Sequence, residues 1–137
     1  MQEYGRILLP VPNKLAVIIL NWRIINMDFK DQPFIPMLFG GDINTYSVAR
    51  AFYEEYQVKT YVFGKFPSGP SYNSNIIEYH ADLKIDTDDV FMKTVRDFAA
   101  AHADKTVLTI GCGDSYVALC SRHKDEMPEN VVAPYID

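Results

Sequence analysis

"FIPMLFGGDINTYSVARAF", residues 34–52, changes its spacing halfway along. Apolar residues fill the first part up to Gly40, Gly41 and Asp42, whereas from Ile43 onward they recur at helical intervals. A short apolar run between helix breakers is typical of a buried parallel strand, and the later spacing predicts an amphipathic helix. The first N–H groups of such a helix point at whatever lies beyond the strand end. This junction therefore predicts an α/β domain with a binding site at the strand end.

The residues around the junction extend this prediction. Gly41 is expected to supply the backbone geometry of the turn, and Asp42 to cap the helix, because its carboxylate can accept bonds from the first free N–H groups. The residues "VKTYVFG" (58–64) alternate in polarity, which predicts a second strand and completes one βαβ unit. On the expected helix, one face carries Thr45, Val48, Ala49, Phe52 and Tyr56, and the opposite face carries Asn44, Ser47, Arg50 and Glu54.

The rest of the chain continues the alternation of strands and helices. A helix is expected to begin with Thr87 as its cap and to carry Phe91, Val95, Phe98 and His102 on one stripe. Together these elements predict an α/β fold with a mostly parallel sheet. In order, they are a loop over 65–75, a short strand within 76–85, a helix over 86–103, a strand over 106–110, a helix from Asp114 and a strand over 130–137.

Composition argues against several classes of protein. The chain has 137 residues, 48% of them hydrophobic and 23% charged, which fits one globular domain. A formal charge of −5 and the lack of a basic run argue against nucleic-acid binding, which depends on clustered Lys and Arg. Cys112 and Cys120 are too few for a zinc site or a disulfide framework. We therefore expect no bound metal and a reducing, cytoplasmic setting.

Residues 1–26 need a separate account. Their most apolar stretch is "LAVIIL" (15–20), which has polar residues on both sides. It is far shorter than the ~20 apolar residues that span a bilayer, and no small-residue cleavage pattern of a signal peptide follows Leu20. These residues are either an extended arm or an extension upstream of Met27, where the domain-like pattern begins. We expect a chain that starts at Met27 to keep its thermal midpoint.

The opening junction is repeated near the carboxyl end. In "TIGCGDSYVAL" (109–119), a strand-like run meets Gly113 and Asp114 as the first run meets Gly41 and Asp42. Ligands of open parallel sheets bind beyond the carboxyl ends of strands, where neighbouring connections leave to opposite faces. We therefore expect both junctions to line one crevice. Glycine after a strand and aspartate before a helix are also common for purely structural reasons.

Other site motifs are incomplete. The second junction is similar to the first motif of S-adenosylmethionine-dependent methyltransferases, but Thr109 takes the place of its acidic residue, and the motif lies late in the chain. Lys65 belongs to no phosphate-binding P-loop, and no G-x-G-x-x-G follows the first strand. Cys112 and the three histidines lack partners at catalytic or metal-ligand spacing, so we expect structural roles for them. Arg50 is expected to pair with Glu54.

Four segments together resemble a known family. They are "FIPMLFGGDINTYSVARAFYEEY", the "GKFPSGP" loop with Ser74, the "GCGDSYVAL" turn and the terminal "PYID", in that order from Phe34 to Asp137. This combination resembles the amino-terminal domain of ATP-grasp carboxylate–amine ligases, particularly the group that includes D-aspartate ligase. The resemblance implies a Rossmann-like, open, mostly parallel pre-ATP-grasp domain over residues 27–137, with helices on both faces.

The resemblance also implies a reaction. In the family, ATP phosphorylates a carboxylate and an amine attacks the acyl phosphate to give an amide, as in the formation of peptidoglycan cross-bridges. ATP and magnesium are bound by further domains outside this chain, which is then expected to bind no cofactor and to be inactive alone. Its implied role is to form one wall of the site for a small amino-acid or carboxylate substrate. The implied substrate-binding residues are Gly40, Gly41, Asp42, Asn44, Lys65, Ser74, Gly113, Asp114 and Tyr116.

Two other functions stay open on the sequence alone. One is a stand-alone module that binds a small ligand or another protein without catalysis. The other is a methyltransferase-like enzyme, which binding of S-adenosylmethionine would support.

Overall fold

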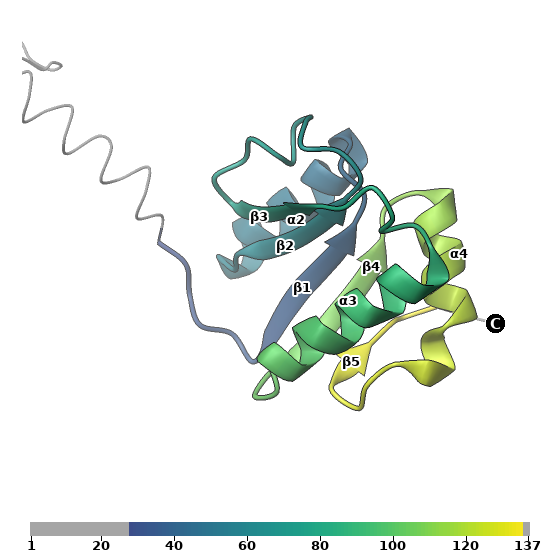
Figure 1. Ribbon diagram of the computed structural model, residues 1–137. Helices are drawn as coiled ribbons and strands as arrows, with labels where there is room; N and C mark the ends of the chain where they lie inside the picture. The colour runs from purple at the N-terminus through teal and green to yellow at the C-terminus, as the bar shows by residue number, and fades with distance from the viewer. Residues whose placement is uncertain (1–27, 136–137) are drawn as a thin grey trace, which may run out of the picture.

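The computed structural model describes residues 28–135, which form one open sheet with helices on both faces (Figure 1). The five strands of this part are all parallel and lie in the order β3-β2-β1-β4-β5. The α/β, Rossmann-like class expected from the sequence is confirmed. In chain order the elements are β1 (Phe34–Phe39), α2 (Ile43–Tyr56), β2 (Thr60–Gly64), β3 (Ile77–Ala81), α3 (Asp88–Ala101), β4 (Thr106–Gly111), α4 (Asp114–Arg122), the 3₁₀ helix η1 (Lys124–Glu126) and β5 (Val131–Val132).

β1 lies at the centre of the sheet because its residues are almost entirely apolar. Residues 35–39 are all buried. The strand pairs with β2 on one side and with β4 on the other, so that Leu38 lies opposite both Val62 and Ile110. Strands that are covered on both faces tolerate no regular polar positions, which explains why "FIPMLF" does not alternate.

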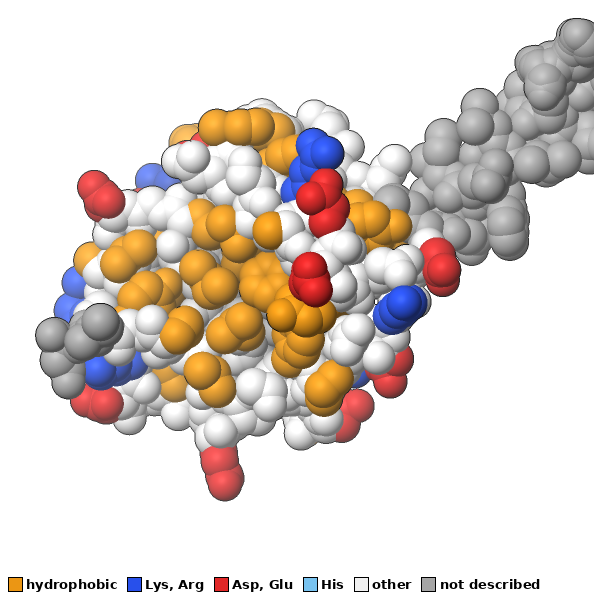
Figure 2. Space-filling view, turned by 180° about the vertical axis from the view of Figure 1, so that it is seen from behind, with side chains coloured by type: hydrophobic (Ala, Val, Ile, Leu, Met, Phe, Trp, Pro, Cys, Tyr) orange, Lys and Arg blue, Asp and Glu red, His pale blue; other side chains and the backbone are white. Residues whose placement is uncertain are grey.

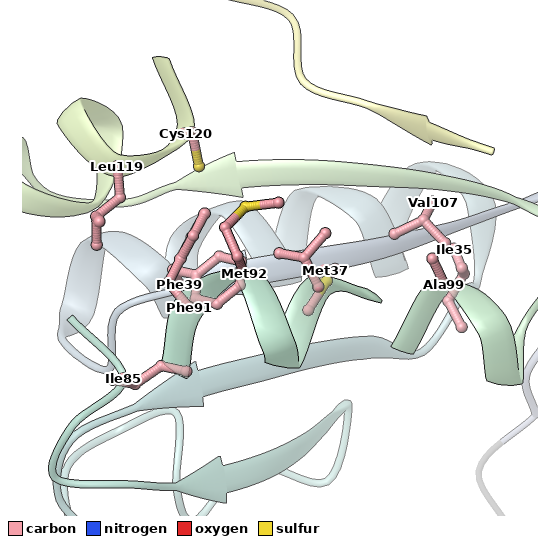
Figure 3. Close-up of a cluster of buried hydrophobic side chains, with 11 residues drawn as sticks. Ile35, Met37, Phe39, Ile85, Phe91, Met92, Ala99, Val107, Leu119 and Cys120 are labelled. Carbon is pink, nitrogen blue, oxygen red and sulfur yellow. The ribbon is translucent and has the colours of Figure 1, made fainter. Parts of the chain in front are cut away.

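Successive residues of β1 point to opposite faces and so contribute to two separate cores. On one face, Met37 and Phe39 pack against α3 and α4, which supply Phe91 and Leu119 among others (Figure 3). On the other face, Leu38 packs under α2 with a smaller set of side chains. The first core is larger because two helices cover it, whereas one helix covers the second.

α2 buries only part of the face expected to be apolar. Thr45 and Ala49 are buried and Phe52 is half-buried, but Tyr56 at the end of the stripe is 44% exposed. Within residues 28–135, the main contacts of α2 are with β1 and β2, so the side of the stripe that is turned away from these strands is less well covered.

α3 begins where the sequence predicts, but without the expected cap. Thr87 occupies the N-cap position, yet its hydroxyl donates to the carbonyl of Lys84 at 2.7 Å and makes no bond to the helix. The prediction of a Thr87 side-chain cap is therefore wrong, because the hydroxyl closes the turn that precedes the helix. Phe91 of the expected stripe is buried, and His102 follows the helix as its C-cap, with its ring 4.2 Å from that of Phe98.

The last strand is much shorter than residues 130–137. β5 has two residues, which pair with Val107 and Leu108. Pro134 has no N–H to donate, so the ladder cannot continue past it. Residues 136–137 lie outside the described residues, as do residues 1–26 and the expectations about "LAVIIL". Within residues 28–135, no helix is both long enough and apolar enough to cross a bilayer.

Candidate functional site

A cleft of about 320 Å³ opens at the carboxyl edge of the sheet, where β1, β2 and β4 end and α2 and α4 begin. α2 packs on one face of the sheet and α4 on the other, so the connections after β1 and β4 leave in opposite directions. This is the place where open parallel sheets bind ligands. The cleft is lined by Gly41, Asp42, Lys65, Phe66, Ser68, Gly69, Pro70, Tyr79 and Tyr116.

The first junction is closed by its aspartate. Oδ1 of Asp42 accepts the backbone N–H groups of Asn44 and Thr45, both at 3.1 Å, and the hydroxyl of Thr45 at 3.3 Å. The predicted cap is confirmed. The carboxylate therefore satisfies the N–H groups that the sequence alone left free for a ligand.

The turn geometry belongs to Gly40 and not to Gly41. Gly40 has φ +136°, which L side chains rarely adopt, and a Cβ there would lie 2.5 Å from Oγ1 of Thr45. Gly41 has no positive φ, but a Cβ on it would lie 2.9 Å from the hydroxyl of Tyr79. The prediction that Gly41 supplies the turn is therefore wrong, since its lack of a side chain makes room for a neighbouring ring instead.

The second junction uses the same residue types differently. Gly113 is the N-cap of α4, with an extended backbone and no side-chain cap, and Asp114 is already the first helical residue. Asp114 therefore does not occupy the N-cap position that Asp42 holds before α2. A Cβ on Gly111 would lie 2.5 Å from the carbonyl carbon of Tyr116 and 2.6 Å from the nitrogen of Val117, so this glycine lets α4 lie directly against the strand end. The first N–H groups of α4 have no side-chain cap.

The two junctions are neighbours, as the sequence predicts. The N–H of Cys112 donates to the carbonyl of Phe39 at 2.8 Å, and the N–H of Gly40 donates to the carbonyl of Phe63 at 3.0 Å. The sheet's hydrogen bonds thus continue up to the point where the helices begin. Tyr116 of α4 stacks on Phe39 and lines the same cleft as the first junction.

The loop between β2 and β3 forms the outer wall of the cleft and is held at three places. The hydroxyl of Tyr79 donates to the carbonyl of Phe66 at 2.7 Å, and the buried hydroxyl of Ser71 donates to the carbonyl of Asp42 at 3.4 Å. Gly69, with φ +93°, passes so close to Gly41 that a Cβ on it would lie 3.0 Å from the carbonyl oxygen of Gly41. The loop therefore folds back over the first junction.

The charges of the cleft are mixed. Nζ of Lys65 lies 3.1 Å from Oδ2 of Asp86, so the cation expected to meet a substrate already has a carboxylate partner. Burial raises the pKa of the Tyr79 hydroxyl, and burial together with the nearby charge of Asp86 raises that of Tyr116. Both phenols are therefore protonated near neutral pH and can act as hydrogen-bond donors.

The structure brings most, but not all, of the predicted site residues together. Asn44 is exposed in the first turn of α2 and contributes a backbone N–H to the cap. Ser74 does not line the cleft, because it lies at the end of the loop, where its Oγ accepts the N–H of Ile76 at 3.3 Å. Lining the cleft are Gly41, Asp42, Lys65 and Tyr116, with Gly40 before the first helix and Gly113 and Asp114 at the start of the second.

Sequence reasoning missed Tyr79, which touches both the loop and the first junction. The strand pattern of "IEYHA" predicts that Tyr79 lies in a strand. The side chain of Tyr79 lies beside Gly41 and Gly64 because this strand pairs in parallel with β2, with Tyr79 opposite Val62. It also missed Asp86 as the partner of Lys65.

The cysteines have no feature of a nucleophile. Burial raises the pKa of the Cys112 thiol, and it raises that of Cys120 to about 11, so both are protonated at neutral pH. Near them, the hydroxyl of the half-buried Tyr135 accepts the N–H of Gly111 at 2.5 Å. The surface pair between Arg50 and Glu54 is present at 2.6 Å, as expected.

Comparison with known proteins gives one informative match. Over 111 residues, 36% of the positions are identical to those of the D-aspartate ligase of Enterococcus faecium (strain Aus0004). The chain is similar to part of that ligase. The match covers 79% of this chain and 26% of the ligase, so the chain spans about a quarter of the length of this relative. No family model matches the chain, and no solved structure matches it.

Proposed function

We propose that this chain is the amino-terminal, substrate-side domain of an ATP-dependent carboxylate–amine ligase of the D-aspartate ligase type. The observation that supports the proposal is the similarity to D-aspartate ligase over most of the chain. The cleft lies at a topological switch point of the sheet, between two Gly-Asp junctions, where its residues can form one wall of an amino-acid site. The complete enzyme would join a carboxylate to an amine in the cytoplasm, with peptidoglycan cross-bridges as the product class.

The proposed role of the cleft is to hold and orient a small amino acid. The uncapped N–H groups of α4 attract a carboxylate, and Lys65 adds a positive charge beside them. Asp42 and Asp114 are at the helix starts, where they favour an ammonium group over a bare anion. The protonated phenol of Tyr116 adds a hydrogen-bond donor, whereas that of Tyr79 already donates to the carbonyl of Phe66.

The residues of this cleft do not fit ATP and its magnesium ions. Phosphoryl transfer needs several cationic groups around the phosphates, but among residues 28–135 the one cation that lines the cleft is Lys65, which pairs with Asp86. No group of three His, Cys, Asp or Glu in the described part is arranged to hold a metal. ATP, which activates the acid in such ligases, is therefore assigned to parts of the enzyme outside this chain, and the chain alone is proposed to be inactive.

A titration followed by amide NMR tests this function. D-Aspartate is added to the ¹⁵N-labelled chain, with succinate as the control that lacks the ammonium group. We expect D-aspartate to shift the amide signals of Gly41, Ser115 and Tyr116, and succinate to shift those of α4 without those of the first junction. If neither acid shifts any amide of the cleft, the substrate role is wrong. If S-adenosylmethionine shifts them instead, the methyltransferase alternative is correct.

A further inference from the structure

The two faces of the sheet are covered unequally. α3 and α4 both pack on one face, and α2 alone packs on the other, where it lies over β1 and β2 (Figure 1). Among residues 28–135, the main contacts of α2 are with β1 and β2; Ile110 of β4 packs into the core under this helix, but Leu108 and the residues of β5 are not part of that core. Figure 2 shows this side, with hydrophobic side chains gathered across its middle and charged side chains mostly around the edge.

The uncovered surface is continuous from α2 to β5. Ile110 of β4 points to the side of α2, because it packs against the core under that helix. Leu108 is two residues earlier and shares this side, and Val132 of β5 lies opposite Leu108. Val132 is 46% exposed. We call this surface the open face, and it consists of Val48, Phe52, Tyr56, Leu108, Ile110 and Val132.

The helix side of the open face is a groove. Val48, Phe52 and Tyr56 line a hollow of about 440 Å³ along the flank of α2, and their neighbour Glu55 supplies its one charged group. The rings of Phe52 and Tyr56 lie 6.1 Å and 5.2 Å from that of Phe34 at the start of β1. These contacts hold the two rings against the start of β1.

A surface of this kind needs a cover. Parallel sheets occur almost only with both faces covered, and large exposed apolar patches on single domains usually mark interfaces. The similarity to D-aspartate ligase indicates which protein segment could cover the open face. The matched region is 26% of that ligase, so most of the enzyme lies outside this region. An apolar segment with a basic residue opposite Glu55 has the complementary chemistry.

We propose that the open face binds the remainder of a D-aspartate-ligase-like enzyme, and thereby fixes the cleft relative to the parts that hold ATP. This inference rests on the proposed function. It adds a defined surface, on the α2 side of β4 and β5, through which this domain joins the rest of the ligase.

Co-expression tests the proposal without any substrate. The full 137-residue chain is produced together with the Enterococcus faecium D-aspartate ligase from which the matched region has been removed. We expect the two to purify as a 1:1 complex. Leu108→Glu and Val132→Glu each place a charge on the open face, and we expect each to weaken the complex by about 30-fold or more, as at an interface hot spot.

The matched control is Leu83→Glu. Leu83 is 64% exposed and lies outside the open face, so this variant should bind within about twofold of the unmodified chain. Thermal midpoints of all three variants, measured on the chain alone, show that any loss of binding is not a loss of folding. No complex with the unmodified chain, or equal binding by all variants, would overturn the proposal.

Two other occupants are separate outcomes that would also overturn it. If the chain alone sediments as a dimer and Val132→Glu makes it monomeric, a second copy covers the open face. If a chain that starts at Met27 binds a hydrophobic dye that the full chain does not bind, residues 1–26 cover it. A complex that forms while D-aspartate fails to shift the cleft amides would keep the interface and reject the substrate role.

Discussion

The junction after β1 and the junction after β4 contain the same residue types and use them in different ways. Asp42 stands just before the first residue of α2 and caps it, whereas Asp114 is itself the first residue of α4 and leaves that helix without a side-chain cap. A shift of the aspartate by one residue thus distinguishes a helix start with a side-chain cap from one without a cap. The cleft therefore lies beside one helix start whose N–H groups bond to Asp42 and one helix start that has no side-chain cap.

The largest expected effect concerns the glycine that brings α4 against the sheet. Gly111→Ala should lower the free energy of unfolding by about 3 kcal/mol, because the new methyl group would meet backbone atoms that cannot move independently. Chemical denaturation gives the value. Gly113→Ala is the control, since its Cβ would lie 3.7 Å from the ring of Tyr116, and its cost should be about 1 kcal/mol or less. Equal costs would show that the two glycines are not distinguished by close packing.

The next effect concerns the turn of the first junction. Gly40→Ala should lower the free energy of unfolding by about 2 kcal/mol, because alanine is strained at φ +136° and its methyl group would clash with Oγ1 of Thr45. Gly41→Ala should cost less, because the hydroxyl of Tyr79 can move away from it. Thermal unfolding of both variants decides the order. A greater loss at Gly41 would mean that contact with the ring of Tyr79, and not backbone conformation, governs this turn.

The cap should have a smaller effect. Asp42→Ala should cost about 1 kcal/mol, and Asp42→Asn should cost little, because asparagine also caps helices. Asp114→Ala should leave stability nearly unchanged, since Asp114 is not the cap. Denaturation measures all three variants. If Asp42→Asn is as stable as the unmodified chain but no longer responds to D-aspartate, the charge of Asp42 acts on the ligand in addition to its structural role.

The smallest effect would come from making the second junction resemble the first. Gly113→Ser provides a hydroxyl at the N-cap of α4 and should raise the free energy of unfolding by a few tenths of a kcal/mol. It should also weaken the response of the Ser115 and Tyr116 amides to D-aspartate, because the new hydroxyl oxygen competes for those N–H groups. Increased stability with an unchanged amide response would show that the start of α4 is not where the acid binds.

Much of the fold could be predicted because local patterns determine it. The apolar runs at 34–39 and 106–110 predict the two central strands, and the change of spacing after Asp42 predicts both α2 and its cap. The length of β5 could not be predicted from its apolar residues, because Pro134 and the pairing with β4 limit it. The lack of a side-chain cap on α3 could not be predicted either. The hydroxyl of Thr87 can bond to an N–H group of the helix or to the preceding turn, and it donates to the carbonyl of Lys84 in that turn.

The site could be located but not assembled from the sequence. The Gly-Asp repeat predicts which strand ends form the cleft, and these residues are local to the junctions. Tyr79 lines the cleft and bonds to Phe66, and Asp86 pairs with the cleft residue Lys65, from which it is 21 positions away in the sequence. Ser74 has the right chemistry for a site but is used to end the loop. Spacing alone cannot distinguish these outcomes, because they depend on how the loop between β2 and β3 folds back.

The central position of β1 has a consequence for synthesis of the protein. Met37 of β1 pairs with Thr109 of β4, 72 positions later. At about 5–20 residues per second, roughly 4 to 14 seconds separate the synthesis of these two residues. During that time, β1 can pair with β2, but its other edge has unpaired N–H and C=O groups and apolar side chains on both faces. The nascent chain is therefore most vulnerable to aggregation until β4 has left the ribosome.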